Sequence, residues 1–107
     1  MVAHLLVDKL AGKFQVKTRA KMHGKNSASS WANWFTVPVD NYVEASSYGP
    51  CPVKEVEWIE VNPVVEIRVG RLIKPLIHNY TSEIQEQLAA EHIRFEISGQ
   101  MLRVFLF

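Results

Sequence analysis

The sequence predicts an α+β domain, in which a mainly antiparallel sheet of about five strands carries a C-terminal helix and a closing β-hairpin. Three patterns support this fold class. Apolar residues recur at helical spacing between residues 75 and 92, two alternating runs flank a glycine in residues 93–107, and a third alternating run covers residues 14–22. We expect the helix to pack on one face of the sheet.

Length and composition indicate one ordinary globular domain. The 107 residues are 48% apolar and 21% charged, and no stretch approaches the ~20 apolar residues of a membrane span. We therefore expect a single domain over residues 1–107, with no membrane association. Polar residues interrupt the short apolar N-terminal run, and Cys51 is the single cysteine, so we expect neither a signal peptide nor a disulfide framework. A cytoplasmic protein is the natural inference.

The first third of the chain contains an ambiguous segment, a clear strand and a loop. Residues 2–11 fit either a helix or a short apolar strand; we favour a helix, which Gly12 would end. Residues 14–22 alternate cleanly and predict a half-buried strand. Its outer row is Lys17, Arg19 and Lys21, which would also protect an exposed sheet edge from aggregation. Residues 23–30 are polar and predict a flexible loop.

The middle of the chain predicts short strands separated by turns. Residues 31–37 are aromatic and β-branched, and Pro38 would end that strand or place it at an edge. Residues 40–52 contain Gly49-Pro50 and predict a long irregular segment, of a kind that is often functional. Residues 53–69 predict two strands around Asn62-Pro63, with a bulge at Trp58-Ile59.

The predicted C-terminal helix has two possible starts. Pro75 could occupy its first position, or Ser82 could cap a shorter helix with Gln85 completing a capping box. We favour the longer helix because the apolar stripe extends back to Ile77. His92 would end it, close to the negative end of the helix dipole.

A β-hairpin with a type II′ turn at Gly99-Gln100 is predicted to follow the helix. This register keeps apolar residues opposite each other on one face, whereas a shift by one residue mixes them with polar residues. The predicted opposed pairs are Ile93–Leu106, Phe95–Val104, Glu96–Arg103 and Ile97–Leu102. The last strand is apolar on its other face too, which predicts that this face is covered by the chain or by a partner.

Protein binding is the function that these features favour. We expect a small non-enzymatic accessory or regulatory module, similar to an inhibitor, an immunity factor or an assembly subunit, whose partner is another protein or a second copy of itself. The expected contact residues come from the last strand and from the segment at residues 40–52. They are Met101, Phe105, Phe107, Tyr42 and Tyr48.

Nucleic-acid binding is the alternative. Residues 1–30 hold six basic residues and one acidic residue, whereas residues 31–107 hold six and ten. A basic strand over residues 13–25 with tryptophans nearby could bind a single-stranded nucleic acid through phosphate contacts and base stacking. The candidate residues are Lys17, Arg19, Lys21, Lys25, Trp31 and Trp34. No established nucleic-acid-binding motif is present.

Catalytic and cofactor motifs are missing from the sequence. The candidate nucleophile and bases are Cys51, His4, His23, His78 and His92. No two of them have a recognised metal-ligand spacing, and no glycine-rich phosphate loop follows a strand. We therefore expect no catalytic residues, no metal and no cofactor.

Overall fold

The computed structural model describes residues 2–106 and is mostly β, with 40% of residues in strands and 24% in helices. Two helices and three sheets are present, instead of one sheet with a C-terminal helix, so the predicted arrangement is wrong. The elements are α1 (Ala3–Phe14), β1 (Lys17–Met22), β2 (Phe35–Thr36), β3 (Tyr42–Ala45), β4 (Tyr48–Pro52), the 3₁₀ turn η1 (Val53–Glu55), β5 (Val56–Asn62), β6 (Val64–Ile67), β7 (Leu76–Asn79), α2 (Thr81–Ala90), β8 (Phe95–Ser98) and β9 (Met101–Phe105).

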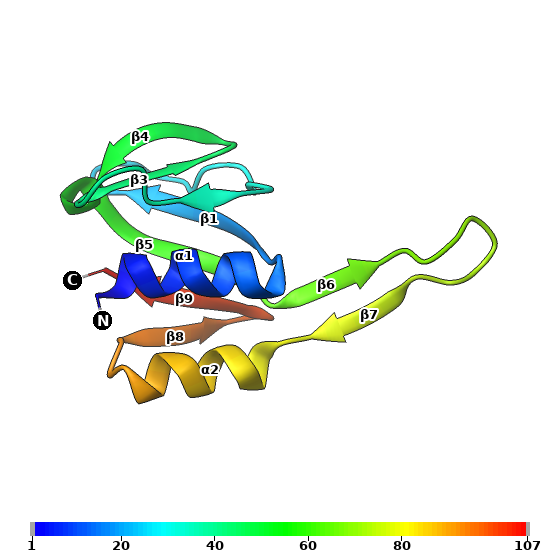
Figure 1. Ribbon diagram of the computed structural model, residues 1–107. Coiled ribbons are helices and arrows are strands. Elements are labelled where there is room, and N and C mark those ends of the chain that lie inside the picture. Colours follow the sequence, from blue (N-terminus) through cyan, green and yellow to red (C-terminus); the bar gives the residue numbers. More distant parts are fainter. Residues whose placement is uncertain (1, 107) are drawn as a thin grey trace.

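The largest sheet has four antiparallel strands in the order β1-β5-β9-β8 (Figure 1). Its inner face carries fully buried side chains, among them Ile59, Leu102 and Val104. The predicted alternation of β1 is confirmed, because Thr18 and Ala20 are buried on that face. The register of β1 against β5 shifts around Glu57, one residue before the predicted bulge.

The first helix, α1, forms where residues 2–11 allowed either a helix or a strand. Leu6, Val7 and Leu10 recur at helical spacing and are buried in the common core, so the favoured interpretation is confirmed. Gly12 does not end the helix, which continues to Phe14. Gln15 ends it instead, with a left-handed backbone at φ 54°.

Residues 40–52 are regular, contrary to the predicted irregular segment. They form the β3–β4 hairpin, which pairs with β2 in a three-stranded sheet. Val43 and Ala45 are buried in the core, and this packing holds a segment whose prolines and glycine suggested a loop. Pro50 and Pro52 are tolerated because β4 is the edge strand of this sheet.

The third sheet is a two-stranded ribbon, and we call residues 64–79 the arm. Pro63 follows β5 and has no N–H to continue the main sheet, and the Asn62 side chain accepts a hydrogen bond from the Val64 N–H at 3.0 Å. The chain then leaves the main sheet as β6 and returns as β7. Figure 1 shows the arm projecting beyond the rest of the molecule. With the arm included, the longest extent of the molecule is 45 Å.

Helix α2 is shorter than predicted. Pro75 and Ile77 belong to the arm, and β7 pairs with β6 up to Asn79. The Asn79 Oδ1 atom accepts a hydrogen bond from the Thr81 N–H at 2.9 Å, which satisfies a donor in the first turn of α2. Ser82 lies inside the helix and is not its cap. Neither helix of residues 2–106 is long and apolar enough to cross a membrane.

The closing hairpin has the predicted register. Phe95 lies opposite Val104, Glu96 opposite Arg103, and Ile97 opposite Leu102. The fourth predicted pair, Ile93–Leu106, is not among the paired residues, which end at Phe95 and Val104. Gly99 has φ 63°, as the first central residue of a type II′ turn requires. Local pattern and turn chemistry therefore determined this part of the fold.

Candidate functional site

The predicted protein-binding residues do not form one surface. Met101 and Phe105 are half-buried on the outer face of β9, and the Arg94 guanidinium lies 4.4 Å from the centre of the Phe105 ring. Tyr42 is 40% exposed on β3. Tyr48 has a buried hydroxyl, and burial raises its pKa well above its usual value. Phe107 lies outside the described residues.

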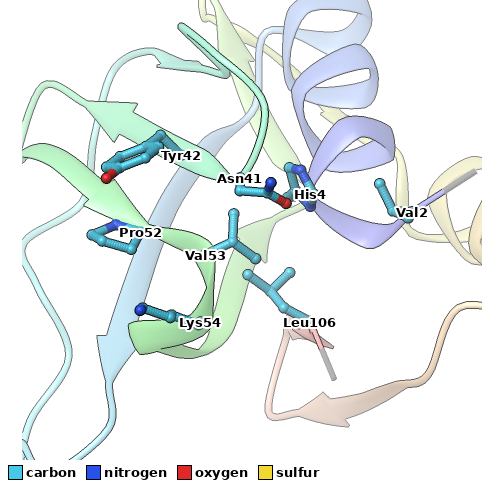
Figure 2. Close-up of a pocket in the computed structure, with 8 residues that line it drawn as sticks. All are labelled: Val2, His4, Asn41, Tyr42, Pro52, Val53, Lys54 and Leu106. Atoms are coloured by element: carbon cyan, nitrogen blue, oxygen red, sulfur yellow. The ribbon is translucent and has the colours of Figure 1, made fainter.

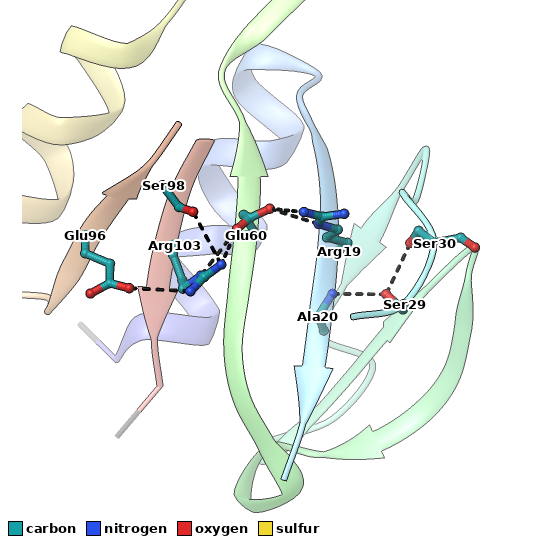
Figure 3. Close-up of polar contacts among 8 residues, drawn as sticks. All are labelled: Arg19, Ala20, Ser29, Ser30, Glu60, Glu96, Ser98 and Arg103. Atoms are coloured by element: carbon teal, nitrogen blue, oxygen red, sulfur yellow. Dashed lines mark hydrogen bonds and ion pairs between the residues drawn. The ribbon is translucent and has the colours of Figure 1, made fainter. Parts of the chain in front are cut away.

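The outer face of the main sheet is organised around a buried carboxylate. Glu60 of β5 is 1% exposed and lies between Arg19 of β1 and Arg103 of β9 (Figure 3). Arg19 donates from Nε and Nη2 to Glu60 Oε1 at 2.8 and 2.6 Å, and Arg103 donates to Oε2 at 3.3 and 3.1 Å. Both oxygens of a charge that would be costly to bury alone are therefore satisfied.

Aromatic rings on this outer face are covered by the same guanidinium groups. Arg19 lies 4.5 Å from the centre of the Trp31 ring, and Arg103 lies 4.2 Å from that of Trp58. These stacked pairs occupy ring surface that would otherwise be available to nucleic-acid bases. Two predicted nucleic-acid-binding residues, Arg19 and Trp31, thus contact each other.

The remaining basic candidates differ in their surroundings. Lys21 forms an ion pair with Glu57, and this hydrogen bond lowers the pKa of the Glu57 carboxyl. Lys17 and Trp34 line one hollow of about 360 Å³ between the end of α1 and β2. Lys25 is exposed in the loop after β1. The structure thus brings the candidates together in pairs, without making one continuous basic surface.

A cavity of about 510 Å³ lies beside the start of α1 and the end of β9 (Figure 2). Tyr42 and Leu106 line it, so the predicted contact residue on β3 lies near the end of the last strand. His4 also lines it and is 8% exposed; burial lowers the pKa of its imidazole, against the opposing effect of Asp40. An activated nucleophile is hydrogen-bonded to its general base. Within residues 2–106, His4 has no hydroxyl or thiol as a hydrogen-bond partner.

The described part of the chain contains no metal site. Its histidine, cysteine, aspartate and glutamate side chains form no group of three or more that could hold a metal ion. The Cys51 Sγ lies 3.5 Å from Met22 Sδ and 4.0 Å from Glu55 Oε2. Burial and the Glu55 charge raise the pKa of this thiol, which favours its unreactive protonated form. Cys51 is half-buried on β4.

The arm is the surface that sequence reasoning missed. Residues 66–79 are all exposed apart from the half-buried Pro75. Six of their large apolar side chains are solvent-exposed, with Leu72 at the tip completely so. They are Ile67, Val69, Leu72, Ile73, Leu76 and Ile77. The available signal was Gly70 and Pro75 between two apolar runs, which also suits a hairpin loop.

The two faces of the arm differ. Opposed pairs put Val65, His78, Ile67 and Leu76 on one face, and Glu66 and Ile77 on the other. At the base, the His78 ring stacks on Tyr80 at 5.0 Å, which attaches the first face to the body. Farther out, the apolar side chains of both faces have no covering from the body.

A groove of about 340 Å³ lies at the base of the arm. Val64 and Ile77 of the arm, Ile97 of β8 and Leu102 of β9 line it, together with Thr81 at the start of α2. Ile97 belongs to the inner face of the sheet yet is 59% exposed. The longer helix predicted from the sequence would have begun before Ile77; α2 instead begins at Thr81, which lines this groove.

Comparison with known proteins identifies a family. The model of DUF6678, described as a family of unknown function, matches residues 6–107. The chain belongs to this family. The match of the DUF6678 model includes the arm, α2 and the closing hairpin. None of the curated proteins and none of the solved structures matches the chain.

Proposed function

We propose that this DUF6678 protein is a non-enzymatic binding module that contacts another polypeptide through its arm. The observation that carries this proposal is the concentration of exposed apolar side chains on residues 67–77. Contiguous apolar surface on a small domain marks an interaction site more often than scattered apolar residues do. The arm replaces the outer face of β9 as the favoured contact surface.

Energetics support a partner for the arm. A two-stranded ribbon is marginally stable by itself, and the outer half of this one receives no packing from the body. Burying one leucine or isoleucine side chain stabilises a complex by ~1.5–3 kcal/mol. Leu72, Ile73 and Ile77 are between 62% and 100% exposed, so a partner that covers them would gain several such contributions.

The contact mode is recognisable from the backbone as well. Each strand of the arm has one edge without a strand partner in the described chain, because the sheet contains β6 and β7 alone. Exposed edges present N–H and C=O groups that a partner strand can pair with. The arm therefore offers apolar side chains and backbone hydrogen-bonding groups together.

Nucleic-acid binding is favoured less, because Arg19 and Lys21 already bind carboxylates of the same sheet. A titration with mixed-sequence single-stranded RNA and DNA, followed by tryptophan fluorescence, distinguishes the two functions. We expect no saturable quenching at low salt. Quenching that saturates and weakens steeply with added salt would support the nucleic-acid alternative.

The direct test compares capture of partners by the wild-type chain and by arm variants. Leu72→Ser and Ile73→Ser remove apolar groups from the tip, whereas Val39→Ser removes a similar group, 61% exposed, from the body. We expect the arm variants to lose bound polypeptides from lysate and the Val39 variant to keep them. Equal capture by all variants would refute the proposal.

A further inference from the structure

The tip of the arm and the groove at its base have complementary properties. The tip of the arm does not contact the groove of its own chain. The tip presents Leu72, completely exposed, between Arg71 and Lys74. Among residues 2–106, no carboxylate lies within ion-pair distance of Arg71 or Lys74. The tip is thus an apolar projection with unpaired positive charges on both sides.

The base of the arm has the opposite character. Its groove is apolar, with Ile77, Ile97 and Leu102 in its walls, and it has an open volume of about 340 Å³. Thr81, the first residue of α2, lines the groove, and the exposed Glu83 lies in the first turn of that helix. Glu66 lies opposite Ile77 in the register of the arm and forms a surface ion pair with Arg68 at 3.5 Å. The base is therefore an apolar hollow with acidic groups nearby.

We infer that the occupant of this groove is the arm tip of a second copy of the chain, so that two copies associate through their arms. This inference rests on the proposed function and names its partner. The two arms lie antiparallel about a two-fold axis halfway along their length, and Leu72 of each copy enters the groove between Ile77 and Ile97 of the other. A two-fold axis makes the same contacts twice, as in most protein dimers.

Charge complementarity favours a second copy over an unrelated protein. In this arrangement Arg71 and Lys74 of one copy approach the exposed Glu83 of the other, so the positive tip meets an acidic side chain of α2.

The first test is the oligomeric state of the purified full chain, measured by sedimentation over an about 100-fold range of concentration. We expect a monomer–dimer equilibrium that Leu72→Ser and Ile97→Ser shift toward the monomer, raising Kd about 100-fold, because each change removes two symmetric contacts. Both side chains are exposed, so both variants should fold. Val39→Ser is the matched control and should leave Kd unchanged.

The second test exchanges the charges. Arg71→Glu with Lys74→Glu should weaken the dimer, and adding Glu83→Lys to the same chain should restore part of the affinity. Oxidation of a chain carrying Leu72→Cys and Ile97→Cys should trap a covalent dimer, whereas Val39→Cys with Ile97→Cys should not. A dimer whose affinity is unchanged by the charge substitutions, or that is not trapped by oxidation, would refute the arm arrangement.

A chain that stays monomeric at every concentration would refute self-association. The capture experiment with Leu72→Ser and Val39→Ser then decides separately whether the arm binds a different polypeptide. The two failures are thus distinguishable.

Discussion

The outer face of the main sheet and the arm use similar residues with opposite results. Both combine basic side chains with large apolar ones, yet on the sheet Arg19 and Arg103 bind Glu60 and cover tryptophan rings. On the arm, Leu72 and Ile77 are 100% and 72% exposed, and the body covers neither of them. A mixed basic and apolar surface therefore indicates a binding site when its groups have no internal partners.

The sharpest contrast is between two leucines. Leu88→Ala should reduce the free energy of unfolding by ~2–5 kcal/mol, because it leaves a cavity in the core, whereas Leu72→Ala should change it by less than ~0.5 kcal/mol. Urea unfolding at a concentration where the wild-type chain is monomeric measures both. A large effect of Leu72→Ala in the monomer would mean that the tip packs on its own body.

The second contrast concerns charge on the sheet. Glu60→Gln should lower the free energy of unfolding by ~1–3 kcal/mol, because Arg19 and Arg103 lose their common carboxylate. Glu96→Gln is the control: its side chain is 53% exposed and pairs with Arg103 at the surface, so we expect less than ~1 kcal/mol. Thermal unfolding of both variants gives the comparison. Equal effects would show that the buried carboxylate adds nothing beyond a surface pair.

The third contrast uses pH, which changes the stability of the folded body through ionisation of Tyr48. Burial raises the pKa of this phenol well above its usual value. The unfolded chain therefore ionises first as pH rises past about 10, and the folded state loses about 1 kcal/mol or more per pH unit until the phenol ionises in it too. Tyr48→Phe should reduce this alkaline loss when unfolding is measured at pH 9 and 11. An unchanged pH dependence would exclude Tyr48 as its cause.

The smallest contrast concerns the rim of the sheet. Lys21→Met removes the pair with Glu57, whose side chain is 38% exposed, and should lower the midpoint of thermal unfolding less than the other substitutions in the body. The same variant should leave dimer formation unchanged, since Lys21 lies on β1 and not on the arm. Loss of the dimer on this substitution would extend the contact surface to the sheet.

Local sequence determined the elements whose partners are close along the chain. The closing hairpin formed in the predicted register, because Gly99 provides the turn and the apolar alternation allows no shift. The alternation of β1 and the helical face of α1 were predictable for the same reason. The prediction of a basic outer row on β1 was also correct, although the pattern did not show the ion pairs of this row with the distant Glu60 and Glu57.

Tertiary structure decided the arm and the site. Residues 75–80 have the periodicity of a helix, but pairing of β7 with β6 gives them backbone hydrogen bonds that the helix would otherwise supply. Residues 40–52 likewise became strands because the core accepts Val43 and Ala45. Local sequence determined periodicity, turns and charge. Which strands pair, and therefore where α2 begins and whether the groove beside Ile97 stays open, depended on contacts between distant segments that no local pattern contains.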